Sequence, residues 1–164
     1  MVSPVKDQGR CGSCWAFSAV GTLESFSLMN GKSVNLAEQQ LVDCSKKYGN
    51  AGCNGGFNYQ GLNYVKDKGI ASTSSYPYTA KTQTCKIDGG DFKIKSVQSA
   101  KGCTGIQTAI QSRPIGVSVD ANKWNKYKSG IFNDCKTSLD HDVLLVGVSD
   151  TYWKIKNSWG KSWG

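Results

Sequence analysis

Apolar residues near the start of the chain recur at the spacing of an α-helix. Within residues 14–29 they lie about 3.6 positions apart, at Ala16, Phe17, Val20, Leu23 and Phe26. This period predicts an amphipathic or fully buried helix that starts at or just before Cys14. A cysteine is therefore expected in the first turn of the first helix.

Two more helices are expected in the first half. One covers 35–44, where Asn35 is suited to the N-cap and Glu38 follows three residues later, as in a capping box. The other covers about 58–68 and is predicted to stop at Gly69, because glycine readily adopts the conformation that ends a helix.

The pattern changes in the last third of the chain. After a short helix expected at about 105–112 and closed by Pro114, the sequence shows continuous or alternating apolar runs that predict strands over 115–121, 142–149 and 152–159. Helices come first and strands second. This order predicts an α+β fold with a helical lobe, an antiparallel β lobe and a cleft between them.

Charge adds little to this picture. The net charge is +8, and the segment KWNKYK at 123–128 interleaves lysines with aromatic residues, as some nucleic-acid-binding surfaces do. The basic residues are nevertheless scattered along the chain, so we interpret them as a solvated surface and expect no nucleic-acid partner. No run of 18 or more apolar residues occurs, so no membrane span is expected.

The cysteines carry more information. There are seven of them: Cys11, Cys14, Cys44, Cys53, Cys85, Cys103 and Cys135. Only the first two form a C-x-x-C pair, so no metal site of the zinc type is expected. An odd count predicts disulfides plus a free thiol, and hence an oxidising compartment. The pair itself leaves open a redox couple, an arm of a disulfide framework, or a nucleophile beside a structural cysteine.

The position of Cys14 favours the nucleophile. The start of a helix favours thiolate over thiol, and a neighbouring imidazolium from the single histidine, His141, would stabilise it further. The two residues can meet only across the cleft. Asn157 is suited to orient the imidazole, Trp159 to shield that hydrogen bond from water, and Gln8 to donate to an oxyanion together with the Cys14 N–H.

Four segments carry a family resemblance: QGRCGSCWAFS, CNGG, DHDV and KNSWGKSWG. In this order and spacing they are similar to the papain family of cysteine proteases, close to its cathepsin L branch. The resemblance extends from Pro4 to Gly164 and implies one papain-like peptidase domain with two lobes. The helical lobe would cover about 1–105, and a β-sheet or barrel-like lobe about 106–164. Family members begin earlier and continue further, so the fold is expected to be incomplete.

The resemblance also implies roles for individual residues. The catalytic set would be the nucleophile Cys14, the general acid and base His141, its orienting residue Asn157, and the oxyanion donor Gln8. The disulfides would be Cys11–Cys53 and Cys44–Cys85. The substrate-binding set would be Gly55, Gly56, Phe57, Asn58, Ser118, Asp142 and Trp159. Asp140 would support the histidine.

Asp142 departs from the family pattern, in which a small uncharged residue follows the histidine. Asp142, Asn58 and Ser118 fall near the S2 pocket, which in the family usually selects a bulky apolar side chain two residues before the cut. A carboxylate there would either admit a basic side chain or raise the pKa of His141.

We therefore expect a cysteine endopeptidase that acts on peptides or proteins as a monomer. No cofactor is implied beyond a reducing environment, and an inhibitory pro-segment is an expected partner. No signal peptide is recognised after Met1, and the family and cysteine usage indicate a lysosome-like vesicle or secretion. The alternatives are an inactive, peptide-binding remnant of such a protease and, less favoured, a thiol oxidoreductase.

Overall fold

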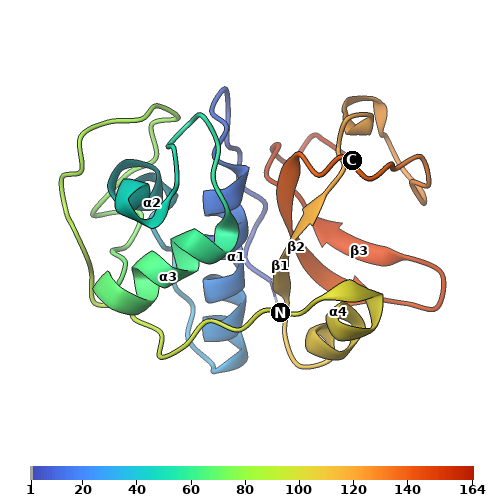
Figure 1. Cartoon of the computed structure of the whole chain (residues 1–164), viewed down its shortest axis with the longest axis horizontal. Coiled ribbons are helices and arrows are strands. Elements are labelled where there is room, and N and C mark those ends of the chain that lie inside the picture. The colour runs from blue at the N-terminus through green and yellow to red at the C-terminus, as the bar shows by residue number, and fades with distance from the viewer. Residues whose placement is uncertain (1) are drawn as a thin grey trace.

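The computed structural model describes residues 2–164, whose helices and strands fall into two parts (Figure 1). The helical part contains α1 (Cys14–Met29), α2 (Glu38–Cys44), the short 3-10 helix η1 (Ser45–Tyr48) and α3 (Asn58–Lys68). The sheet part contains α4 (Gly102–Ile110), β1 (Ile115–Val119), the short 3-10 helix η2 (Trp124–Lys126), β2 (His141–Val148) and β3 (Trp153–Lys156). The predicted α+β class is confirmed.

Helix α1 is buried on almost every face because both parts pack against it. Figure 1 shows α1 between the other helices of its own part and the sheet, and it contacts α2, α3, β1 and β2. Trp15 and Val20 are completely buried, whereas Phe26 is 43% exposed. Burying an apolar side chain such as Val20 contributes about 1.5–3 kcal/mol. Of the two alternatives predicted for this helix, the buried one is correct.

The core of the helical part brings α3 unusually close to α1. The side chains of Trp15, Leu41 and Tyr64 are fully buried there. A Cβ atom added at Gly61 of α3 would lie 3.3 Å from the side chains of Ala19 and Leu41. Glycine at this position therefore permits the close approach of the two helices.

The sheet is antiparallel with the strand order β1-β2-β3. Strand β2 lies in the centre, and its first five residues, 141–145, are buried. The register pairs Val119 with His141 and Ser118 with Asp142. Side chains of directly opposite residues lie close together on one face of a sheet. The register therefore places Ser118 beside Asp142.

The predicted cap of the second helix is wrong. The helix begins at Glu38, and its N-cap is Ala37, which has no capping side chain. Asn35 lies too early in the chain: its Oδ1 accepts a hydrogen bond from Thr73 Oγ1 at 3.1 Å. The Glu38 carboxylate accepts a hydrogen bond from Lys6 at 2.6 Å instead of closing a capping box.

Other boundaries differ by a few residues. Strand β3 ends at Lys156, although the pattern predicted it to 159, because Asn157 and Ser158 leave the sheet to contact His141 and the N-terminal segment. Helix α4 begins earlier than predicted and packs against β2. The predicted lobe boundary near residue 105 falls inside this helix and stays a prediction.

Two disulfides hold the helical part together, and they are the pairs that the family resemblance implied. Cys11 is bonded to Cys53, and Cys44 to Cys85, across 42 and 41 residues of sequence. Closing loops of this length in the unfolded chain stabilises the fold by about 4 kcal/mol per bond in the chain-entropy treatment. Within residues 2–164, no helix is long and apolar enough to cross a membrane.

Removing the Cys44–Cys85 disulfide should destabilise the protein more than removing free thiols does. The double variant Cys44→Ala/Cys85→Ala should lower the free energy of unfolding by about 2–4 kcal/mol in urea titrations. The matched control is Cys103→Ala/Cys135→Ala, because both of these cysteines are free and exposed. Equal stability of the two double variants would contradict the structural role of the bond.

Candidate functional site

Cys14 lies at the N-terminal end of α1, where the first backbone N–H groups of a helix have no partner within it. Nearby backbone N–H groups, those of Asp142 and Trp15 among them, act to lower the pKa of the Cys14 thiol. Burial is the larger influence, so the pKa of the Cys14 thiol is raised. The start of the helix was predicted to lower the pKa of Cys14. Backbone N–H groups do act in that direction, but burial outweighs them, so the pKa of the Cys14 thiol taken by itself is not lowered.

The loop before α1 is fixed by a close backbone contact. The Gly12 N–H donates to the Cys53 carbonyl at 2.9 Å, beside the Cys11–Cys53 disulfide. A Cβ atom at Gly12 would lie only 2.4 Å from that carbonyl oxygen, so no larger residue fits without a backbone shift. This glycine and the disulfide set the point at which α1, and therefore Cys14, begins.

His141 is the first residue of β2, the strand that packs against α1. Its Nε2 lies 2.7 Å from Asn157 Oδ1. That oxygen also accepts the backbone N–H of Ser158 at 2.8 Å. Because a backbone N–H can only donate, this atom must be the amide oxygen, and Nε2 must then carry the proton. Nδ1 is left as the basic nitrogen of the neutral ring.

Aromatic rings surround the imidazole. The centroid of the Trp159 ring lies 4.9 Å from that of His141, and Trp124 packs edge-on at 6.1 Å. Burial by these neighbours lowers the pKa of His141, while the Asn157 hydrogen bond and the charges of Asp140 and Asp142 act to raise it. Asp142 thus acts on the pKa of His141 in the expected direction, but burial outweighs it.

Gln8 lies beside the start of α1 and is held from the other part of the molecule. Its Oε1 accepts a hydrogen bond from Ser158 Oγ at 2.6 Å, and its Nε2 donates to the Cys11 carbonyl at 3.0 Å. Its backbone N–H also donates to the Ser158 carbonyl at 2.8 Å. An amide nitrogen has two hydrogens, so one donor of Gln8 remains for a ligand.

Gly55 and Gly56 precede α3, and only the first of them has open space beside its Cα atom. Gly55 has φ +113°, and a Cβ atom there would meet open space. Gly56 has no space for a side chain, because a Cβ atom there would lie 2.4 Å from Asn50 Oδ1 and 2.9 Å from the Trp15 ring. Next to them, Phe57 is 54% exposed. The carbonyl of Gly55 accepts the Ala51 N–H at 2.8 Å within the loop, so the backbone of this glycine is already engaged beside the exposed Phe57.

Asp142 joins the two parts of the molecule. Its carboxylate accepts hydrogen bonds from Ser118 Oγ at 2.6 Å and from the Asn58 N–H at 3.1 Å. Asn58 is the first residue of α3, whose own N-cap residue, Phe57, provides no side-chain cap. The carboxylate therefore caps α3 from β2. The structure brings Asn58, Ser118 and Asp142 together, and their role in binding substrate stays a prediction.

Asp140 supports the histidine from the preceding turn. Its N–H donates to the Val119 carbonyl at 3.0 Å, and its Oδ1 accepts the N–H of Ala121 at 2.8 Å. These contacts fix the chain where it enters β2. The backbone of His141 is consequently held from both β1 and the loop that follows it.

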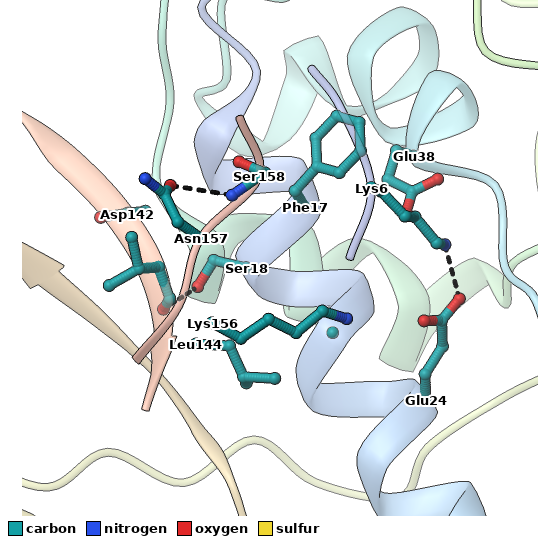
Figure 2. Close-up of a pocket in the computed structure, with 12 residues that line it drawn as sticks. Lys6, Phe17, Ser18, Glu24, Glu38, Asp142, Leu144, Lys156, Asn157 and Ser158 are labelled. Carbon is teal, nitrogen blue, oxygen red and sulfur yellow. Dashed lines mark hydrogen bonds and ion pairs between the residues drawn. The ribbon is translucent and has the colours of Figure 1, made fainter. Parts of the chain in front are cut away.

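A buried cluster of charges, which was not predicted from the sequence, lies between the two parts (Figure 2). Lys6 donates to Glu24 at 2.7 Å and to Glu38 at 2.6 Å, and both carboxylates are almost fully buried. Lys156 of β3 donates to Ser3 Oγ at 3.0 Å, and Ser3 donates to Glu24 at 2.5 Å. Lys6, Glu24, Glu38 and Lys156 line a cavity of about 20 Å³. No local pattern could have revealed them, because they come from four separate segments.

Comparisons with known proteins agree with this geometry. A family profile described as papain family cysteine protease matches residues 1–164. Cathepsin L 2 of Paramecium tetraurelia is 49% identical over 164 residues, covering 98% of this chain and 52% of that protein. Digestive cysteine proteinase 3 of Homarus americanus is 46% identical, covering 100% of this chain and 56% of that protein. The chain spans about half the length of these curated relatives.

Solved structures show the same fold. The Carica candamarcensis cysteine protease CMS1MS2, in complex with E-64, superposes with a TM-score of 0.92 at 37% identity, covering 99% of this chain and 80% of that one. Digestive procathepsin L 3 of Tenebrio molitor gives a TM-score of 0.90 at 40% identity, covering 99% of this chain and 58% of that one. The chain belongs to the papain family of cysteine proteases.

Proposed function

We propose that this chain carries the catalytic machinery of a cysteine endopeptidase. One observation carries the proposal. Asp142 lies near enough to Cys14 to act on the pKa of its thiol, and the adjacent His141 is hydrogen-bonded to Asn157 through Nε2. The nucleophile Cys14 therefore comes from the helical part and the base His141 from the sheet part. Nδ1, the basic nitrogen of the imidazole, is not used by the hydrogen bond to Asn157.

The proposed reaction has two steps. The Cys14 sulfur attacks the carbonyl carbon of a peptide bond, His141 Nδ1 accepts the thiol proton, and the imidazolium then returns it to the departing amine. Water next attacks the thioester and gives a proton to His141. The carboxylic acid leaves, and the proton returns to the Cys14 sulfur.

Charge separation in this pair is governed by burial. Burial raises the pKa of Cys14 and lowers the pKa of His141, so neither group charges readily by itself. A thiolate beside an imidazolium offsets both costs, and the two charges should therefore form together. The hydrogen bond from His141 Nε2 to Asn157 fixes the ring in the tautomer whose Nδ1 can accept the proton.

Two groups are placed to stabilise the oxyanion that forms. The Cys14 N–H lies at the end of α1, and the remaining N–H of Gln8 is held nearby by Ser158. Preorganised donors of this kind typically contribute about 10²–10³-fold to the rate each. The backbone of Gly55 and Gly56 would pair with an extended peptide, with Phe57 and Trp159 flanking it.

The remaining expectations concern the whole protein. We propose peptide or protein substrates, a monomer, two lobes divided near residue 105, an inhibitory pro-segment and a lysosome-like or secreted location. The Tenebrio molitor neighbour is a pro-enzyme form, which supports the pro-segment. Cys11 is bonded to Cys53, which disfavours a C-x-x-C redox couple with Cys14.

Labelling by an epoxysuccinyl inhibitor should depend on both members of the pair. Intact-mass analysis at mildly acid pH should show one adduct on the wild type and none on Cys14→Ala or His141→Ala, and peptide turnover should fall by roughly 10⁶-fold in both variants. Cys103→Ala, which removes an exposed free thiol, is the matched control and should label normally. An adduct on Cys14→Ala would disprove the assignment of the nucleophile.

Removing the charge of Asp140 should move the pH profile toward acid. Asp140 raises the pKa of His141, so Asp140→Asn should lower that pKa and shift the limb of the kcat/KM profile that reports His141 to lower pH, by less than about one pH unit. Asparagine retains the oxygen that accepts the Ala121 N–H. The control is Asp134→Asn, an exposed acid that forms an ion pair with Lys123. A shift to higher pH, or the same shift in the control, would contradict this role.

A further inference from the structure

Tyr78 joins two segments that meet at the proposed nucleophile. It lies in the long connection between α3 and α4, outside any helix or strand. Its hydroxyl donates to the Gln8 carbonyl at 2.7 Å and lies 2.7 Å from Ser13 Oγ. Because a carbonyl can only accept, the single phenol proton goes to Gln8, and Ser13 must donate to Tyr78. One hydroxyl thus links the main chain of Gln8 to the side chain of the residue before Cys14.

The hydroxyl groups on both sides of this bridge are committed to it. Burial raises the pKa of Tyr78, so the phenol keeps its proton at mildly acid to neutral pH. Ser13 is completely buried and is the N-cap residue of α1, but its side chain makes no cap hydrogen bond. Serine is among the preferred N-cap residues, and a capping bond would stabilise the helix. The chain therefore forgoes a favourable cap and makes the bridge to Tyr78 instead.

The loop that carries Tyr78 is itself held in place. The Thr79 N–H donates at 2.8 Å to Oε1 of Gln39, a fully buried residue of α2. Ala80 has φ +55°, a left-handed conformation that is unfavourable for alanine. A Cβ atom at Gly9 would lie 3.4 Å from the Ala80 Cβ, so this residue packs against the N-terminal segment. Such strain persists only where the surrounding structure requires it.

The two bridged residues carry or adjoin the proposed oxyanion donors. Gln8 provides the side-chain amide, and the carbonyl carbon of Ser13 is bonded to the N–H of Cys14. Ser158 holds Gln8 from the sheet part of the molecule. Tyr78 holds it from the helical part and holds the start of α1 with the same atom. Oxyanion donors are effective when their positions are fixed in advance, so the spacing of the two donors matters for the rate.

We propose that Tyr78 is a positioning residue that sets the distance between the two oxyanion donors, the amide of Gln8 and the N–H of Cys14. The inference rests on the proposed endopeptidase function, because the oxyanion forms only during acyl transfer. Tyr78 acts on the chain on either side of the site and not on the reacting atoms. Loss of its hydroxyl should weaken binding of the transition state and leave binding of the substrate unchanged.

The test measures kcat and KM of Tyr78→Phe on a fluorogenic peptide amide. Phenylalanine keeps the ring, whose centroid lies 5.0 Å from that of Phe17, and removes only the hydroxyl. We expect kcat to fall by about tenfold, less than the roughly 10²–10³-fold loss on deleting a donor outright, with KM unchanged. The matched control is Tyr76→Phe, because the hydroxyl of this buried residue donates to Asp43 of α2 at 2.8 Å. This control should keep the wild-type kcat.

Alkylation of Cys14 separates an effect on the oxyanion from damage to the nucleophile. Iodoacetamide reacts with the thiolate by displacing iodide and forms no oxyanion. Peptide mapping should therefore find Cys14 of Tyr78→Phe alkylated within about twofold of the wild-type rate. An unchanged kcat, an equal loss of kcat in Tyr76→Phe, or an alkylation rate that falls as far as kcat would each overturn the role of Tyr78.

The outcomes also separate this inference from the proposed function. A wild type that is alkylated at Cys14 but cleaves no peptide would overturn the endopeptidase, and this inference with it. Wild-type turnover without a loss in Tyr78→Phe would overturn the inference alone. If Tyr78→Phe failed to fold, Ser13→Ala would decide, because it removes the other end of the bridge. It should lower kcat at constant KM, and a wild-type kcat would overturn the proposal.

Discussion

The packing of α1 between the other helices and the sheet is the constraint on which the remainder of the structure depends. Ser18 of this helix donates to the Val143 carbonyl of β2 at 2.9 Å, and a Cβ atom at Gly21 would lie 3.2 Å from the Leu144 side chain. Helix and strand are therefore in direct contact over successive turns. Because Cys14 begins the helix and His141 begins the strand, this contact also determines their separation.

The same interface contains buried charged side chains, which are tolerated because opposite charges lie in contact. Glu24 and Glu38 are almost fully buried, and burial raises the pKa of Glu38 while Lys6 opposes that shift. Lys6 contacts both carboxylates, so the N-terminal segment carries the compensating charge. Loss of one partner would leave an uncompensated buried charge, which typically costs about 3–5 kcal/mol. The first residues are thus part of the interface as much as α1 is.

Sequence patterns predicted the elements well where they reflect burial and less well where distant contacts intervene. The 3.6-residue period located α1, and the run at 142–149 located β2. Asn35 was predicted as a cap because the local motif fits, but the contact of Glu38 with Lys6 takes its place. The family motifs indicated which residues would meet. These motifs did not reveal the burial that governs the pKa of Cys14. They also did not reveal the hydrogen bonds between Ser158 and Gln8.

Asn157 fixes the position of the His141 ring at a cost in the stability of the fold. Its Oδ1 accepts from both His141 and Ser158, while its Nδ2 is buried without a hydrogen-bond partner among residues 2–164. An unsatisfied buried donor costs about 1–3 kcal/mol. Apolar residues would fill this space at less cost, but they would leave the imidazole free to rotate or to take the other tautomer. The strand therefore ends before Asn157, and Trp159 covers the hydrogen bond, because a fixed proton on Nε2 is what keeps Nδ1 basic toward Cys14.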